Sequence, residues 1–182
     1  MKRGLLLLLL CTAGLFIASR SASPAGAQPS SELRALNVSL GHWVFHGTTL
    51  KTKSGKPGSW TWSEDCRWSP NQLYLECTFS NVWSGKPVES LVVDTYNTVD
   101  HSYWHYEFYA SGEKGGKPFV APMTVTGNTW IESGRKAIPG KRDGERIVYH
   151  WGPPGHVRVA IETSKDGAHW TPVDQGEGSR QK

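Results

Sequence analysis

Short stretches rich in β-branched and aromatic residues alternate along the chain with clusters of glycine, proline, asparagine and serine. This pattern is typical of strands joined by tight turns. A helix signal is weak, since no leucine occurs from Val92 to the last residue. About ten strands are therefore predicted, over residues 41–50, 59–68, 72–83, 87–96, 101–110, 118–126, 128–138, 144–151, 156–164 and 168–178.

The succession of strands predicts an all-β, closed antiparallel up-and-down barrel. A meander of this length has two edge strands, and closure removes both edges. Ahead of the first strand, Ser31 can cap one or two helical turns that reach Leu36. We therefore expect one lipocalin-like barrel domain over residues 28–182, with a short helical lead.

Residues 1–27 have the form of a secretory signal peptide. Lys2 and Arg3 precede an apolar run that ends near Ile17, and the small residues 25–27 form a cleavage site of the A-x-A type. An uncleaved membrane anchor is the alternative, but the apolar run is too short to span a bilayer comfortably. We expect an exported protein without a stable membrane anchor, either periplasmic or secreted and of bacterial origin.

Removal of this leader changes the charge of the chain. The full sequence holds 20 Lys and Arg against 16 Asp and Glu, a net charge of +4. The leader carries three of the bases and no acid, so the remainder has a net charge of +1. These bases are scattered, whereas a phosphate-binding surface needs clustered positive charge. Nucleic acid is therefore not an expected partner. Nine tryptophans also exclude a disordered chain.

One of the three cysteines, Cys11, lies in the leader, and the other two belong to one predicted hairpin. If Asn71 and Gln72 form its tip, Cys66 lies directly opposite Cys77. Opposed strand residues have the separation that a disulfide needs, and exported proteins are oxidised. The hairpin therefore predicts a disulfide, the alternative being two free thiols in the core.

The same register sorts the side chains of this hairpin into two faces. The cysteine face carries Trp62, Phe79, Glu64 and Asn81, whereas the opposite face is polar throughout. Because burial of an unpaired carboxylate is costly, Glu64 needs a partner, water or a raised pKa. Polar groups within an aromatic interior indicate a ligand cavity. The alternative is that Glu64 is hydrated near a barrel mouth.

Four side chains from the next two strands are candidates to share this interior: Asp94, Tyr103, His105 and Glu107. They fall on the same side as Glu64 if the two hairpin tips lie at residues 85–86 and 98–99. A carboxylate, a phenol and an imidazole in one cavity would form a possible acid–base site. A register slip of one residue would turn all of them outward.

The chain is similar to a bacterial lipocalin-like (calycin) family of unknown function. The similarity rests on a Gly-x-Trp start at residues 41–43 and a Ser-x-Asp-Gly-x-x-Trp motif at 164–170. Further matches lie at Tyr96, Asn97, Tyr103, Gly112 and residues 127–130. The resemblance implies a closed barrel with an internal cavity, and no reaction. It also implies that Trp43 packs under Arg180 or Arg158 and closes one end of the barrel.

The haem-binding nitrobindin barrels provide an alternative resemblance. They open with a Gly-x-Trp-x-x-x-Gly pattern, which Gly41, Trp43 and Gly47 match. Such a barrel needs one axial histidine in an apolar pocket. His150 is the best candidate, although the favoured interpretation is an exposed strand residue on the face opposite Tyr149. No closely spaced histidine or cysteine pair suggests a metal site.

Three functional hypotheses follow from these patterns. The leading one is an exported barrel without a cofactor that binds a small, partly apolar ligand in an aromatic cavity. The second is a haem-binding redox enzyme of nitrobindin type. The third is a structural or interaction domain whose tryptophans fill the core. The sequence assigns no catalytic residue, since no serine or cysteine nucleophile has a base at useful spacing.

Overall fold

The computed structural model describes residues 28–50, 57–83, 86–110, 118–134 and 144–182. The predicted signal peptide lies outside these ranges. A 3₁₀ helix, η1, comes first and is followed by ten strands. These elements are η1 (Leu33–Ser39), β1 (Gly41–Thr49), β2 (Gly58–Trp68), β3 (Tyr74–Trp83), β4 (Lys86–Asn97), β5 (Ser102–Tyr109), β6 (Phe119–Thr126), β7 (Thr129–Ser133), β8 (Gly144–Trp151), β9 (His156–Ser164) and β10 (Trp170–Arg180).

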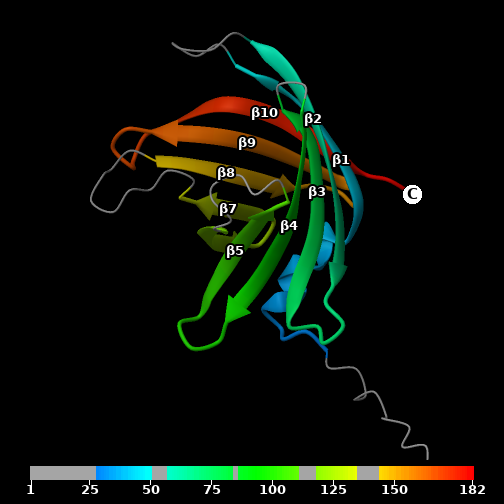
Figure 1. The fold of residues 1–182 in the computed structure, drawn as a ribbon. Helices are drawn as coiled ribbons and strands as arrows, with labels where there is room; N and C mark the ends of the chain where they lie inside the picture. Colours follow the sequence, from blue (N-terminus) through cyan, green and yellow to red (C-terminus); the bar gives the residue numbers. More distant parts are fainter. Residues whose placement is uncertain (1–27, 51–56, 84–85, 111–117, 135–143) are drawn as a thin grey trace, which may run out of the picture.

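The strands form the closed antiparallel barrel that the sequence predicts. Each described strand pairs with its neighbours in the chain, and β10 returns to pair with β1, where Trp43 lies opposite Arg180. Figure 1 shows the last strand beside the first, with η1 below them near the lower end of the barrel. The predicted up-and-down topology is therefore confirmed. Among the described residues, no helix has the length and hydrophobicity needed to cross a bilayer.

The helical lead differs from its predicted form. It begins at Leu33 and continues to Ser39, so it starts and ends later than expected. Glu32 occupies the N-cap position, while the hydroxyl oxygen of Ser30 accepts the Leu33 N–H at 3.2 Å. The predicted cap residue, Ser31, instead donates its hydroxyl to the Glu32 carboxylate at 2.9 Å. The capping assignment to Ser31 was therefore wrong.

The register of the β2–β3 hairpin follows the prediction. Cys66 lies opposite Cys77, and the two are joined by a disulfide. The next two hairpins differ from their predicted pairings. A tip at residues 85–86 would pair Asn81 with Ser90, but Asn81 lies opposite Val88. A tip at residues 98–99 would pair Asp94 with Tyr103, but Asp94 lies opposite His105. A tip moved by one residue shifts the pairing by two positions, so the predicted inward side chains remain on the inner face.

The end of the barrel next to η1 is closed by buried apolar and aromatic contacts. Leu33 and Leu36 of η1 are buried in the core. The indole N–H of Trp43 donates to the Ser39 carbonyl at 2.8 Å, and the Arg180 guanidinium lies 4.9 Å from the centre of the Trp43 ring. A cation over an indole face adds to the packing of this end.

Candidate functional site

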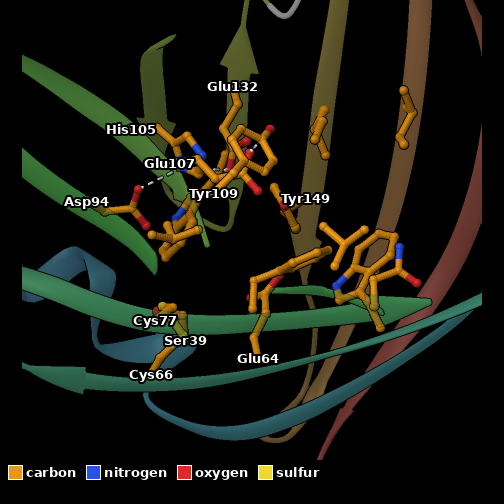
Figure 2. Close-up of a pocket in the computed structure, with 18 of the residues that line it drawn as sticks. Ser39, Glu64, Cys66, Cys77, Asp94, His105, Glu107, Tyr109, Glu132 and Tyr149 are labelled. Carbon is orange, nitrogen blue, oxygen red and sulfur yellow. Dashed lines mark hydrogen bonds and ion pairs between the residues drawn. A yellow bond between two sulfur atoms is a disulfide. The ribbon is translucent and has the colours of Figure 1, made fainter. Parts of the chain in front are cut away.

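The barrel encloses a cavity of about 650 Å³, lined by residues of β2–β5 and β7–β9 and by Ser39 of η1. That volume suits a small organic molecule. Six of the seven pocket residues proposed from the sequence line it: Trp62, Glu64, Phe79, Asn81, Asp94 and His105. Figure 2 shows Glu64 on one wall and the labelled group around His105 on another.

One wall, here termed the aromatic wall, is built from stacked rings. Four of its rings line the cavity, and three pack behind them: Trp62, Trp130, Tyr149 and Trp151 in the lining, and Trp43, Phe45 and Trp60 behind. The ring centres of Trp60 and Trp62 are 4.2 Å apart, and those of Phe45 and Trp62 are 5.1 Å apart. Trp130 and Trp151 approach to 4.8 Å. Such contacts stabilise aromatic pairs beyond the area that they bury.

Glycines on β1 and β10 make room for this wall. A Cβ on Gly47 would lie 2.0 Å from the Trp60 ring, and one on Gly176 would lie 2.5 Å from the same ring. A Cβ on Gly178 would come within 2.5 Å of Phe45. Any side chain at these positions would displace a core aromatic residue, so the glycines allow the rings to reach the barrel axis.

The other wall, here termed the polar wall, buries four ionisable groups: Asp94 on β4, His105 and Glu107 on β5, and Glu132 on β7. The Nδ1 atom of His105 lies 2.9 Å from the Asp94 carboxylate and 3.7 Å from that of Glu132. Burial by itself lowers the pKa of His105, but the Glu132 carboxylate and the hydrogen bond to Asp94 outweigh burial and raise it to about 9. The imidazole is therefore charged at neutral pH.

Glu107 is fixed within the polar wall by two hydroxyl groups. Ser90 donates to one carboxylate oxygen at 2.8 Å, and Tyr109 donates to the other at 2.6 Å. These two hydrogen bonds, from donors on β4 and β5, orient the carboxylate.

Glu64 stands apart from this network. It lies on the inner face of β2, directly between Trp43 of β1 and Phe79 of β3. The side chain keeps some accessible surface, and that surface is part of the cavity wall. Burial raises the pKa of Glu64 to about 8, and the carboxylates of Glu132 and Asp94 add to the shift. Glu64 is therefore largely protonated at neutral pH in the unliganded cavity.

Two sequence-predicted residues lie outside the cavity. The Tyr103 hydroxyl donates to the Glu32 carbonyl at 2.9 Å, and its ring packs against Tyr96, so Tyr103 attaches the helical lead to the barrel. His150 is exposed on the outer face of β8, where its Nδ1 lies 3.1 Å from the Thr129 hydroxyl. Tyr103 is therefore not a lining residue, and His150 does not reach the interior.

Three important residues were not among the site residues proposed from the sequence: Glu132, Tyr109 and Trp130. Each lies two positions from another inward residue on its own strand, since Trp130 and Glu132 share β7, and Tyr109 follows Glu107. Period-two alternation could have found all three once one inward residue of each strand was fixed.

The histidine proposed from the sequence as a haem ligand does not line the cavity. His150 faces outward, and the histidine present in the described lining is His105. No group of three or more histidine, cysteine or carboxylate side chains among the described residues could hold a metal ion.

The polar wall can bind and orient a polar group of a ligand. The serine hydroxyls near it already donate hydrogen bonds within the protein. The Ser90 hydroxyl donates to Glu107, and the Ser39 hydroxyl donates to the Leu36 carbonyl at 2.9 Å. The two lining cysteines are joined in the disulfide. Within the described lining, no serine or cysteine therefore contacts His105 as an activated nucleophile.

Comparison with known proteins identifies no family, since neither a family model nor a curated protein matches the chain. Among solved structures, Rv2717c from M. tuberculosis shares 18% identity over 85% of this chain and 100% of its own, with a TM-score of 0.56. A DUF3598 protein of unknown function from Nostoc punctiforme PCC 73102 shares 12% identity over 80% of this chain and 49% of its own, with a TM-score of 0.49. The likeness to Rv2717c supports the barrel fold and carries no function.

Proposed function

We propose that the protein is an exported ligand-binding barrel that holds a small, partly apolar molecule in its central cavity. The observation that carries this proposal is the cavity of about 650 Å³, with aromatic rings on one side and buried polar groups on the other. Ligand sites commonly combine an apolar lining with a few placed polar groups. A core filled throughout by tryptophan, as the structural hypothesis requires, would leave no such volume.

A titration with the neutral fluorophore N-phenyl-1-naphthylamine tests cavity binding. We expect saturable binding with increased fluorescence, because the dye enters an apolar environment. Val92→Trp would reduce the volume, since Val92 lines the cavity, and we expect affinity at least about tenfold weaker. Leu91→Trp is the matched control, because Leu91 is exposed on the opposite face of β4.

Circular dichroism verifies that both variants fold, and Ile161→Trp provides a second inward substitution if Val92→Trp does not fold. Absence of saturable dye binding by the native protein would overturn the proposal. Equal loss of affinity in the inward and outward variants would also contradict it, because the dye would then bind outside the cavity.

The disulfide supports the exported part of the proposal, since such bonds persist in oxidising compartments. Expression of the complete chain in a bacterial host, followed by fractionation and N-terminal sequencing, tests it. We expect protein outside the cytoplasm that begins at Gln28. Cytoplasmic protein that begins at Met1 would contradict export.

A further inference from the structure

The ionisable groups around the cavity favour a ligand of one charge over a ligand of the other. The described lining residues include four carboxyl groups and one imidazole, with no lysine or arginine among them. An anionic ligand would meet carboxylates at short range in a medium of low dielectric constant, where like charges repel strongly. A cation would be attracted to the same groups, so the lining selects for positive charge.

Glu64 is the carboxyl group best placed to meet such a ligand. Asp94 and Glu132 lie 2.9 and 3.7 Å from His105, and Glu107 accepts two hydroxyl hydrogen bonds. Glu64 lies across the cavity from these groups (Figure 2), and burial raises its pKa more than the attraction of His105 and the contact with Trp62 lower it. Aromatic neighbours surround it, with Trp43 and Phe79 on either side. Carboxylates and aromatic rings together form the environment that favours organic ammonium groups.

A second feature, independent of the carboxyl groups, points to a bound polar molecule. The indole N–H groups of Trp130 and Trp151 and the Nε2 atom of His105 are buried without a hydrogen-bond partner among the described residues. These side chains line the cavity and are at most 7% exposed. Buried donors almost always have acceptors, so a ligand with an oxygen atom could accept a hydrogen bond from these side chains.

We propose that the ligand is an organic cation, an amine or quaternary ammonium compound with an apolar body and an oxygen acceptor, whose positive charge lies beside Glu64. This inference rests on the proposed ligand-binding function and specifies its chemical class. A cation beside Glu64 favours the ionised carboxylate, so binding near neutral pH releases a proton from this residue. The titratable groups that face Glu64 are Glu132, Asp94 and His105, while its neighbours on β1 and β3 do not titrate.

Calorimetric titration with two isosteric probes tests the inference. The probes are 3-methoxyphenyltrimethylammonium and the neutral 3-tert-butylanisole, which share their shape and ether oxygen and differ by one charge. We expect the cation to bind at least about tenfold more tightly to the native protein. In Glu64→Gln this preference should fall to within about threefold, while affinity for the neutral probe stays within about twofold.

Asp65→Asn is the matched control, because Asp65 is the next residue on β2 and faces outward, with a side chain 67% exposed. It removes the same charge from the protein and should leave the preference unchanged. Titrations in phosphate and HEPES at the same pH measure the protons released. We expect about 0.5 to 1 proton per cation for the native protein and close to none for Glu64→Gln.

Neutral and cationic probes that bind equally well would overturn the inference and leave the proposed function intact. Failure of both probes to bind would contradict ligand binding itself. Equal loss of preference in Glu64→Gln and Asp65→Asn would also overturn the inference, because the selectivity would then come from overall charge.

Discussion

The aromatic and polar walls of the barrel are buried to a similar degree but are held together by different forces. Trp43 and Phe45 are 1% and 0% exposed, and Asp94 and His105 are 6% and 5% exposed. Stacked rings fill their side of the barrel by dispersion and apolar burial. The polar groups instead need hydrogen-bond partners at fixed distances and angles. Side chains placed by this requirement leave part of the barrel interior unfilled, and that space is the cavity.

This difference separates stability from function within one interior. Within the aromatic wall, Trp43 donates to the Ser39 carbonyl of η1 and packs against Arg180 of β10, and these contacts help to close one end of the barrel. His105 in the polar wall and Glu64 across the cavity from it have pKa values that are displaced from their usual values. Buried ionisable groups of this kind are enriched at functional sites. We therefore expect substitutions in the aromatic wall to act on folding, and those around Glu64 to act on binding.

The largest effect is expected for Phe45→Ala in the aromatic wall. Phe45 is fully buried and stacks on Trp62, so its truncation leaves a void and should cost about 3–5 kcal/mol of unfolding free energy. Ile161→Ala is the comparison, because Ile161 is only partly buried and already adjoins the cavity. Urea denaturation measures both variants, and equal losses would contradict the assignment of stability to the aromatic wall.

Gly176→Ala tests the same wall by overpacking and should cost about 2–3 kcal/mol. The added Cβ would lie 2.3 Å from the backbone oxygen of His46 and 2.5 Å from Trp60. Gly58→Ala is the control, since its Cβ would meet nothing within 4 Å. We expect the control to be neutral in thermal unfolding. A Gly176→Ala protein with unchanged stability would show that this wall tolerates extra volume.

The barrel and the disulfide could be predicted because both depend on local patterns. Turn clusters set the strand boundaries, and alternation around Cys66 and Cys77 set the hairpin register. The inward placement of Glu64 followed from the same alternation. The position of Tyr103 was missed because its hydroxyl contacts Glu32, which is distant in the sequence. His150 could not be placed by composition, since its outward direction depends on the β8 register.

The composition of the polar wall was harder to predict for a physical reason. Asp94 and His105 lie opposite each other on the paired strands β4 and β5, whereas Glu132 comes from β7, which pairs with neither. Glu132 and His105 therefore belong to strands that are not neighbours in the sheet. Their proximity is a consequence of barrel curvature, which no local pattern specifies. The pKa changes of His105 and Glu64 arise from that proximity and from burial, so they too required the structure.

Removal of the disulfide is expected to have an intermediate effect. The double substitution Cys66→Ala/Cys77→Ala should cost about 2–3 kcal/mol, since the bond closes a loop with a sequence separation of 11. Thermal unfolding under oxidising conditions measures the change, and native protein with added reductant provides an independent comparison. An unchanged unfolding midpoint in both experiments would show that the hydrogen bonds of β2 and β3 suffice to hold the cavity wall.

The last effect has the opposite sign, because Glu64→Gln should stabilise the protein at alkaline pH. The pKa of Glu64 is raised from 4.5 to about 8, so the unfolded chain releases this proton first and stability falls as pH rises between those values. The variant lacks this loss and should be more stable than the native protein at pH 8, with little difference below pH 4.5.

Denaturant titrations from pH 4 to 10 on the native protein, Glu64→Gln and Asp65→Asn measure this dependence. In Glu64→Gln the remaining decline should belong to His105, whose raised pKa gives stability that is complete below about 6.5 and is lost as pH passes 9. A variant less stable than the native protein at pH 8 would mean that the charged form of Glu64 supports the fold. Glu64 would then contribute to stability as the aromatic wall does.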